Sequence, residues 1–109
     1  MKNIRGRMYG WRLMLGLSVM AAFAGNEIIG MGRAISDRAN DAYIQDVVLK
    51  KEYRGQGFGS RLVEAIVHRL EADGLKWIGL IAEKNSRNFY VPLGFGNMKK
   101  AVPMVKMIV

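Results

Sequence analysis

The sequence predicts an α/β (α+β) domain in which a mixed central sheet packs against one main helix. Short apolar runs rich in β-forming residues recur along the chain, and residues 60–72 repeat their apolar side chains at the spacing of an amphipathic helix. The expected order is strand, strand, strand, helix, strand, helix, strand, and residues 42–82 resemble a βαβ unit. With 109 residues, half of them hydrophobic, the chain fits one domain over residues 1–109.

Three strands are expected in the N-terminal half of the chain. Residues 16–23 form a short apolar run, and residues 27–36 return after Gly25-Asn26, a pair that favours a hairpin turn. After a polar turn, residues 42–49 form the third strand, and its continuously apolar end is typical of a central strand. Strict alternation places Tyr43, Gln45 and Val47 on one face of this strand and Ile44, Asp46 and Val48 on the other.

The main helix is expected over residues 60–72. Its apolar face consists of Leu62, Val63, Ile66, Val67 and Leu70, which recur at helical spacing. Gly74 follows as a left-handed cap residue that ends the helix.

A strand, a short helix and a last strand are expected after the main helix. Residues 75–82 are an apolar strand-like run, and a short helix begins at Asn85-Ser86 and stops at Pro92 and Gly94. The tail, residues 101–109, has the composition of a final strand with a proline near its start.

The N-terminal segment admits two interpretations. Residues 1–16 show no regular pattern and are expected to be irregular. The apolar stretch 13–24 ends in Ala22-Phe23-Ala24 and resembles a secretory signal with an A-x-A cleavage site, but it is too short to cross a membrane. Gly16 and Ser18 interrupt it, and it continues into a strand-like run, so a cytoplasmic protein without a membrane partner is the favoured interpretation.

Charge and composition narrow the classes of partner. The chain carries 17 lysine and arginine residues against 9 acidic ones, a formal net charge of +8, which suits nucleic acid, an anionic membrane or a polyphosphate cofactor. The basic residues form no single run, and zinc-finger spacing is absent, which disfavours nucleic acid. Without cysteine, and with His68 as the single histidine, the sequence offers no thiolate or multi-histidine metal site.

A glycine-rich loop before the main helix is the strongest functional signal. Residues 53–62, "YRGQGFGSRL", place three glycines at alternate positions between Arg54 and Arg61. The first amides of a helix lack intrahelical acceptors, so the amides of Gly55, Gln56, Gly57, Phe58, Gly59 and Ser60 can converge on a phosphate. The spacing fits neither a P-loop nor a dinucleotide fingerprint. A turn without a ligand is the alternative.

These residues resemble the acyl-CoA-binding segment of the GNAT superfamily of N-acetyltransferases. Arg54, Gly57 and Gly59 match its Arg/Gln-x-x-Gly-x-Gly/Ala pattern, and residues 89–95, "FYVPLGF", resemble its Phe/Leu-Tyr-x-x-Leu-Gly-Phe segment. The resemblance spans residues 17–109. Members usually carry a first strand and two helices before this region, and residues 1–16 look unlike those helices, so the chain looks N-terminally shortened.

The resemblance implies the location of acetyl-CoA. Its pyrophosphate would lie on the amides of residues 55–60, and its pantetheine arm along Val47, Val48 and Leu49. A strand amide would polarise the thioester carbonyl. Asn85 matches an asparagine that often contacts the cofactor in this family.

The resemblance also implies an activity: an amine attacks the thioester directly, and Tyr90 protonates the departing thiolate. Asp46 is a candidate base, although it can instead pair with an arginine such as Arg33. The predicted function is therefore acetyl transfer to a primary amine of a small molecule or peptide. The alternative is a non-catalytic or truncated acyl-CoA-binding module, and a homodimer is compatible with either.

Overall fold

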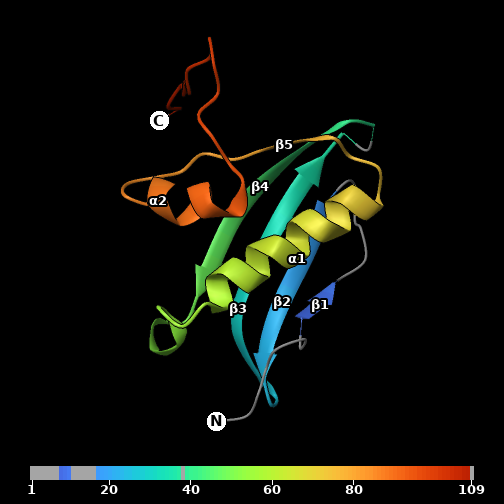
Figure 1. The fold of residues 1–109 in the computed structure, drawn as a ribbon, viewed down its shortest axis with the longest axis vertical. Helices are drawn as coiled ribbons and strands as arrows, with labels where there is room; N and C mark the ends of the chain where they lie inside the picture. Colours follow the sequence, from blue (N-terminus) through green and yellow to red (C-terminus); the bar gives the residue numbers. More distant parts are fainter. Residues whose placement is uncertain (1–7, 11–16, 38, 109) are drawn as a thin grey trace.

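The computed structural model, which describes residues 8–10, 17–37 and 39–108, contains a mixed five-stranded sheet with one long helix across one face (Figure 1). The strands are β1 (Met8–Gly10), β2 (Leu17–Ala24), β3 (Glu27–Ser36), β4 (Asp41–Leu49) and β5 (Trp77–Gly79). Each of the first three is antiparallel to the next, whereas β5 is parallel to β4. The predicted fold class is confirmed.

The helical elements follow β4 and β5. A 3-10 turn, η1 (Lys51–Tyr53), leads into α1 (Phe58–Ala72), and α2 (Arg87–Tyr90) continues into η2 (Val91–Leu93). Helix α1 begins two residues earlier than predicted, because Gly57 adopts a left-handed conformation with φ 88° and serves as its N-cap. Its C-terminus matches the prediction.

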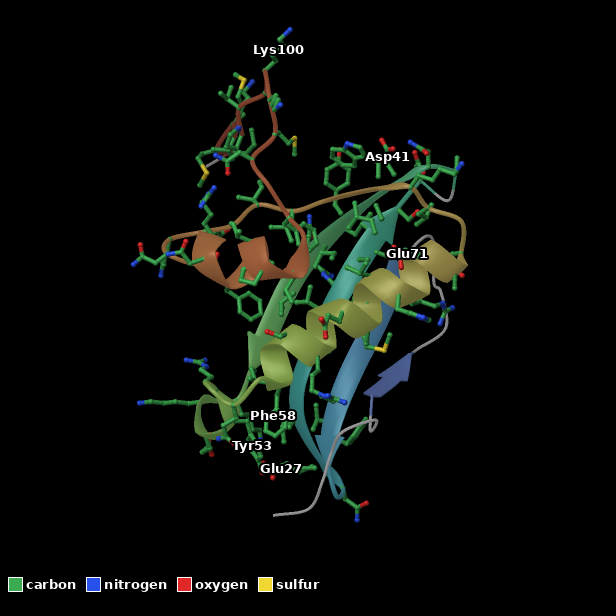
Figure 2. The ribbon with its side chains drawn as sticks, in the orientation of Figure 1. Glu27, Asp41, Tyr53, Phe58, Glu71 and Lys100 are labelled. Carbon is green, nitrogen blue, oxygen red and sulfur yellow. The ribbon has the colours of Figure 1, made fainter. Side chains whose placement is uncertain are left out.

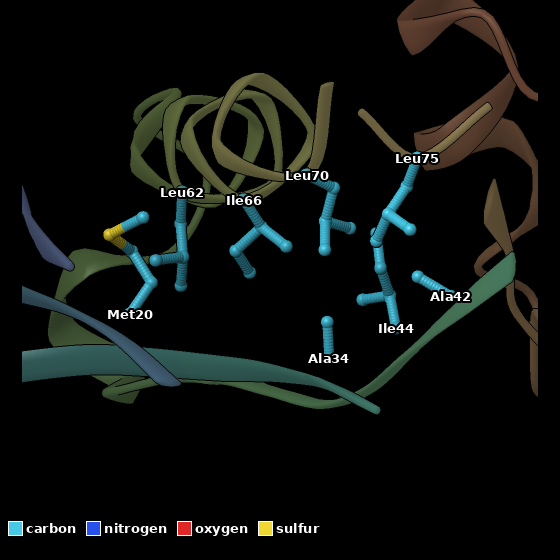
Figure 3. Packing of buried hydrophobic residues seen from close by; sticks show 8 residues of the cluster. All are labelled: Met20, Ala34, Ala42, Ile44, Leu62, Ile66, Leu70 and Leu75. Carbon is cyan, nitrogen blue, oxygen red and sulfur yellow. The ribbon is translucent and has the colours of Figure 1, made fainter. Parts of the chain in front are cut away.

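The core lies between α1 and the sheet (Figure 3). The predicted apolar face of the helix is confirmed, since Leu62, Val63, Ile66 and Leu70 are all buried. Each such side chain contributes about 1.5–3 kcal/mol by its removal from water. These contacts hold the start of α1 in a fixed position relative to β4.

A bulge in β4 overturns the predicted alternation of its side chains. Met31 of β3 pairs with Val48, but Arg33 pairs with Gln45, so β4 carries one extra residue between these pairs. Asp46 absorbs it with φ 55°, a backbone conformation that aspartate tolerates better than most residues. As a result, Val47 packs against the core below α1, on the face predicted for its neighbours Asp46 and Val48.

Two predicted strands differ from the observed structure. The strand predicted over 75–82 forms only at Trp77–Gly79, because β4 pairs with β5 through Asp41–Tyr43 alone. The strand predicted for the tail is wrong, since residues 101–108 form none and Val109 lies outside the described residues. The side chains of this tail are exposed, and no strand of the described sheet lies beside it to accept its backbone hydrogen bonds.

One strand was not predicted. Strand β1 pairs with β2 between Met8 and Ala22 and between Gly10 and Met20, within the segment expected to be irregular. Three residues are too few for a period-2 pattern to be recognised in a sequence. The rest of that segment, residues 1–7 and 11–16, lies outside the described residues.

Candidate active site

An open strand edge forms the first part of the site. Strands β4 and β5 pair only through Asp41–Tyr43 and Trp77–Gly79. Beyond this pairing the chain after β5 leads to α2 and separates from β4, which leaves a split between the two segments (Figure 1). In the part of the chain that the structure describes, residues 44–49 of β4 therefore pair with β3 alone. An extended polar chain lying in this split can exchange hydrogen bonds with the β4 backbone, as an added strand would.

The glycine loop forms the second part of the site. Gly55 and Gly57 have φ angles of 75° and 88°, and a Cβ at either position would meet no atom within 4 Å. None of the six amides of residues 55–60 donates a hydrogen bond to any described residue. Together with the positive end of the α1 dipole, roughly half an elementary charge, these amides can bind an anion.

Side chains hold this loop in place. The Nε atom of Arg54 donates to the carbonyl oxygen of Leu49 at 3.0 Å, and Nε2 of Gln56 donates to that of Glu52 at 3.1 Å. Tyr53 and Phe58, with ring centroids 5.9 Å apart, pack on a second small core cluster under the loop. Figure 2 shows both rings at the loop end of α1. The loop is thus anchored at several points while its amides stay open.

Tyr90 lies in a groove at the other side of the split. A groove of about 670 Å³ is bounded by residues 77–82, by α2 and by residues 94–103. Tyr90 is half-buried in it, edge-on to Phe89 and Phe95 with centroids 4.8 and 5.8 Å away. Burial raises the pKa of Tyr90 above the ordinary 10.0 of tyrosine, so its hydroxyl is protonated at neutral pH.

Asp46 forms an ion pair with Arg33, which the sequence allowed as the alternative to a role as a base. Its Oδ2 atom lies 2.6 Å from Nε of Arg33, and both side chains are partly exposed, 61% and 37%. The Nε atom makes no well-directed hydrogen bond, so the contact is an attraction between charges. Asp46 thus has two evident structural roles, the positive φ at the bulge and this ion pair.

Two further aromatic residues line the groove with Tyr90. Trp77 packs edge-on against Tyr43 at 5.2 Å, and Phe95 also packs against the main core cluster. Only the parallel register of β4 with β5 could have revealed the contact between Trp77 and Tyr43. Asn85 is exposed before α2 and does not cap it, because Ser86 holds the N-cap position.

Charged residues are sparse around the groove. Arg87 is the single charged side chain lining it among the described residues, and its Nε donates to Oδ1 of Asn97 at 3.0 Å. The described residues contain no cluster of three potential metal ligands. Within the same residues, none of the helices has the length and apolarity needed to cross a bilayer.

The chain resembles acetyltransferases in both sequence and structure. A family model described as "Acetyltransferase (GNAT) family" matches residues 4–95. GCN5-related N-acetyltransferase 2, chloroplastic, of Arabidopsis thaliana is 45% identical over 69 residues, which cover 63% of this chain and 27% of that protein.

Solved structures agree with the family model. A GNAT-family acetyltransferase of Streptococcus pneumoniae superposes with a TM-score of 0.75 at 22% identity, covering 86% of this chain and 73% of that one. A protein of Clostridium acetobutylicum described as a predicted acetyltransferase, solved with acetyl-CoA, superposes with a TM-score of 0.71 at 20% identity, covering 83% of this chain and 64% of that one. These structures share the fold, and the match of the family model to residues 4–95 shows that the chain belongs to the GNAT acetyltransferase family, whose members carry out acyl transfer.

Proposed function

We propose that residues 1–109 act as one domain that transfers an acetyl group from acetyl-CoA to a primary amine. The observation that carries this proposal is the row of six unpaired amides at the start of α1, beside the open edge of β4. A diphosphate and an extended amide-containing arm are the two features of CoA that need such a pair of surfaces. The net charge of +8 favours the anionic cofactor further.

The residues present fit acetyl-CoA well. The amides of Gly55, Gln56, Gly57, Phe58, Gly59 and Ser60 would hold the diphosphate. Arg54 and Arg61 are exposed on either side of these amides and add positive charge there. Val47, Val48 and Leu49 would offer backbone groups to the pantetheine arm, and Asn85, which is exposed before α2, would contact the cofactor.

The chemistry asks little of the protein beyond orientation. Acetyl-CoA supplies the acetyl group as a thioester; the C–S bond breaks as the C–N bond forms, the amine loses a proton and the sulfur gains one. Tyr90 is the residue suited to donate a hydrogen bond or a proton to the sulfur, because its hydroxyl is protonated and has no partner among the described residues. The base role of Asp46 stays a prediction, because its carboxylate already pairs with Arg33.

A second candidate function is a module that binds acyl-CoA without turnover. It is favoured by the absence of any carboxylate from the described lining of the groove, which leaves no evident base there. The chain also spans well under two thirds of the curated relatives that it matches, 27% of the Arabidopsis protein. Both functions share the same cofactor site.

One pair of measurements separates the two. Mass spectrometry of the purified protein under native conditions would detect retained CoA, and a thiol-release assay with acetyl-CoA over a panel of amines would detect transfer. CoA binding with thiol release supports the enzyme, and CoA binding without release supports the module. Absence of CoA binding would refute both functions.

The cellular setting remains part of the proposal. A cytoplasmic location without metal, membrane or nucleic-acid partners is the simplest one for the predicted activity. The Arabidopsis relative is named as chloroplastic, so an organelle is the competing location for a protein of this kind.

A further inference from the structure

Two aromatic rings lie side by side on the face of the sheet opposite to α1. Ala42, Ile44 and Ile78 pack in or against the core under α1. Because side chains alternate along a strand, their neighbours Tyr43 and Trp77 lie on the other face. Their rings meet edge-on with centroids 5.2 Å apart, and the two residues are 46% and 37% exposed. Both side chains line the groove and are accessible from it.

Gly79 leaves the space that the indole of Trp77 occupies. It pairs with Tyr43 across the two strands and lies two residues after Trp77, on the same face. A Cβ on Gly79 would lie 2.6 Å from Cη2 of Trp77 and 2.7 Å from Cζ3, so the ring lies over Gly79 where any side chain would collide with it. We call Tyr43, Trp77 and Gly79 the aromatic platform.

The chemistry of the groove disfavours a polycationic occupant. Its volume of about 670 Å³ is that of a small-molecule site. Among its described lining residues there is no carboxylate, and the one charged side chain is Arg87, a cation. A second ammonium group on the occupant would find no counter-ion there and would be repelled by Arg87, whereas an aromatic ring would find the platform.

We propose that the aromatic platform binds the ring of an arylalkylamine, and that such amines are the acceptors of this protein. The inference rests on the proposed acetyl transfer and names its substrate class. Tyr90 lines the same groove as the platform, so the acceptor's ring would lie against Tyr43 and Trp77 while its amine reaches the thioester near Tyr90. Aromatic rings favour offset and edge-on contacts with other rings, which two partly exposed rings offer.

The transfer is balanced without a further reactant. The neutral nitrogen of the arylalkylamine forms the C–N bond as the C–S bond of acetyl-CoA breaks, and the proton that the nitrogen loses is matched by the proton that the sulfur gains. A cation in the groove disfavours the protonated amine. Arg87 therefore favours the neutral nucleophile in a groove whose described lining holds no carboxylate.

Equilibrium binding of phenethylamine, measured by saturation-transfer NMR, tests the platform without acetyl transfer. Its ring protons should be saturated more strongly than its chain protons. Cyclohexylethylamine is the matched ligand, because it has the same chain and ammonium group and a more apolar ring without a π-system. Phenethylamine should bind at least about threefold more tightly, and putrescine should bind most weakly. Tighter binding of cyclohexylethylamine, as in a merely apolar groove, or of putrescine, as at a cation site, would overturn the proposal.

Two substitutions remove the platform in different ways. Trp77→Leu deletes the ring and should weaken phenethylamine binding at least about fivefold, whereas Trp77→Phe should restore most of the affinity. Gly79→Ala keeps Trp77 but forces its indole to move, so it should act like Trp77→Leu. Ile28→Ala alters an exposed residue of β3 that does not line the groove, and it should bind like the native chain. Native affinity in folded Trp77→Leu or Gly79→Ala would refute the platform.

The thiol-release assay separates this proposal from the acetyl transfer on which it rests. Phenethylamine should give a higher kcat/KM than putrescine, and Trp77→Leu should raise its KM more than it lowers kcat. Thiol release with putrescine but not with phenethylamine would retain acetyl transfer and overturn the arylalkylamine class. A protein that binds no CoA would refute acetyl transfer itself, while platform-dependent binding of phenethylamine would still support the aromatic site.

Discussion

Replacing Gly57 by valine tests the proposed diphosphate site, and the chain supplies its own control at the other end of α1. Gly57 and Gly74 have nearly the same φ, 88° and 87°, and a Cβ at either position meets no atom within 4 Å. Valine therefore introduces backbone strain at both positions and a steric clash with the protein at neither. The two variants differ only in what they place near the six open amides.

The magnitudes separate strain from binding. A left-handed conformation costs a side-chain-bearing residue about 1–2 kcal/mol, so both variants should melt lower by on the order of 10 °C. Gly57→Val also puts a branched side chain into the open space in front of the amides. CoA affinity should then fall by about tenfold or more, or about 1.4 kcal/mol, whereas Gly74→Val should bind CoA like the native chain.

Calorimetric titration with CoA at a temperature where all three proteins are folded measures these affinities. Circular dichroism melting curves recorded on the same samples report the strain. The assignment of the diphosphate to this loop is refuted if Gly57→Val binds CoA as tightly as Gly74→Val, because the two proteins carry equal strain.

Three further predictions concern the reaction and the bulge. Tyr90→Phe should lower turnover by at least about tenfold in the thiol-release assay without changing CoA affinity; an unchanged rate would exclude the acid role. Since burial raises the pKa of Tyr90, the rate of the native protein should show no alkaline loss from this group below about pH 10, which a profile of rate against pH checks. The protonated form of Tyr90 is favoured in the folded state, so its contribution to the free energy of unfolding should be lost only above that pH. Asp46→Ala should be less stable than Asp46→Asn by about 1 kcal/mol, and should therefore melt at a lower temperature, because asparagine tolerates the φ of 55° better. Equal melting temperatures would show that the positive φ does not favour aspartate or asparagine at this position.

The sequence was sufficient for those elements that depend on local pattern. The three long strands and the apolar face of α1 follow from periodicity, and Gly25-Asn26 indicated the hairpin correctly. Strand β1 was missed because it is short, and the tail was predicted as a strand because composition reports β-propensity but not the presence of a partner. Pairing between distant segments is the information that a single sequence lacks.

The part of the site that depends on a local sequence pattern was also predictable. The glycine loop is a contiguous motif, so its open amides could be anticipated from residues 53–62 alone. The bulge at Asp46 could not, since one extra residue in a strand leaves no mark in a period-2 pattern and reverses every side chain after it. Val47 was therefore placed on the wrong face of the strand.

The order of the strands has a consequence for how the chain is built. Strands β1 to β4 lie beside one another in the order of synthesis, so their pairing closes only short loops. Strand β5 is the exception, because it reaches β4 only after α1 has crossed the sheet. A nascent chain can thus assemble its antiparallel half early, and the split between β4 and the chain beyond β5 takes shape only after residues 77–79 have been synthesised.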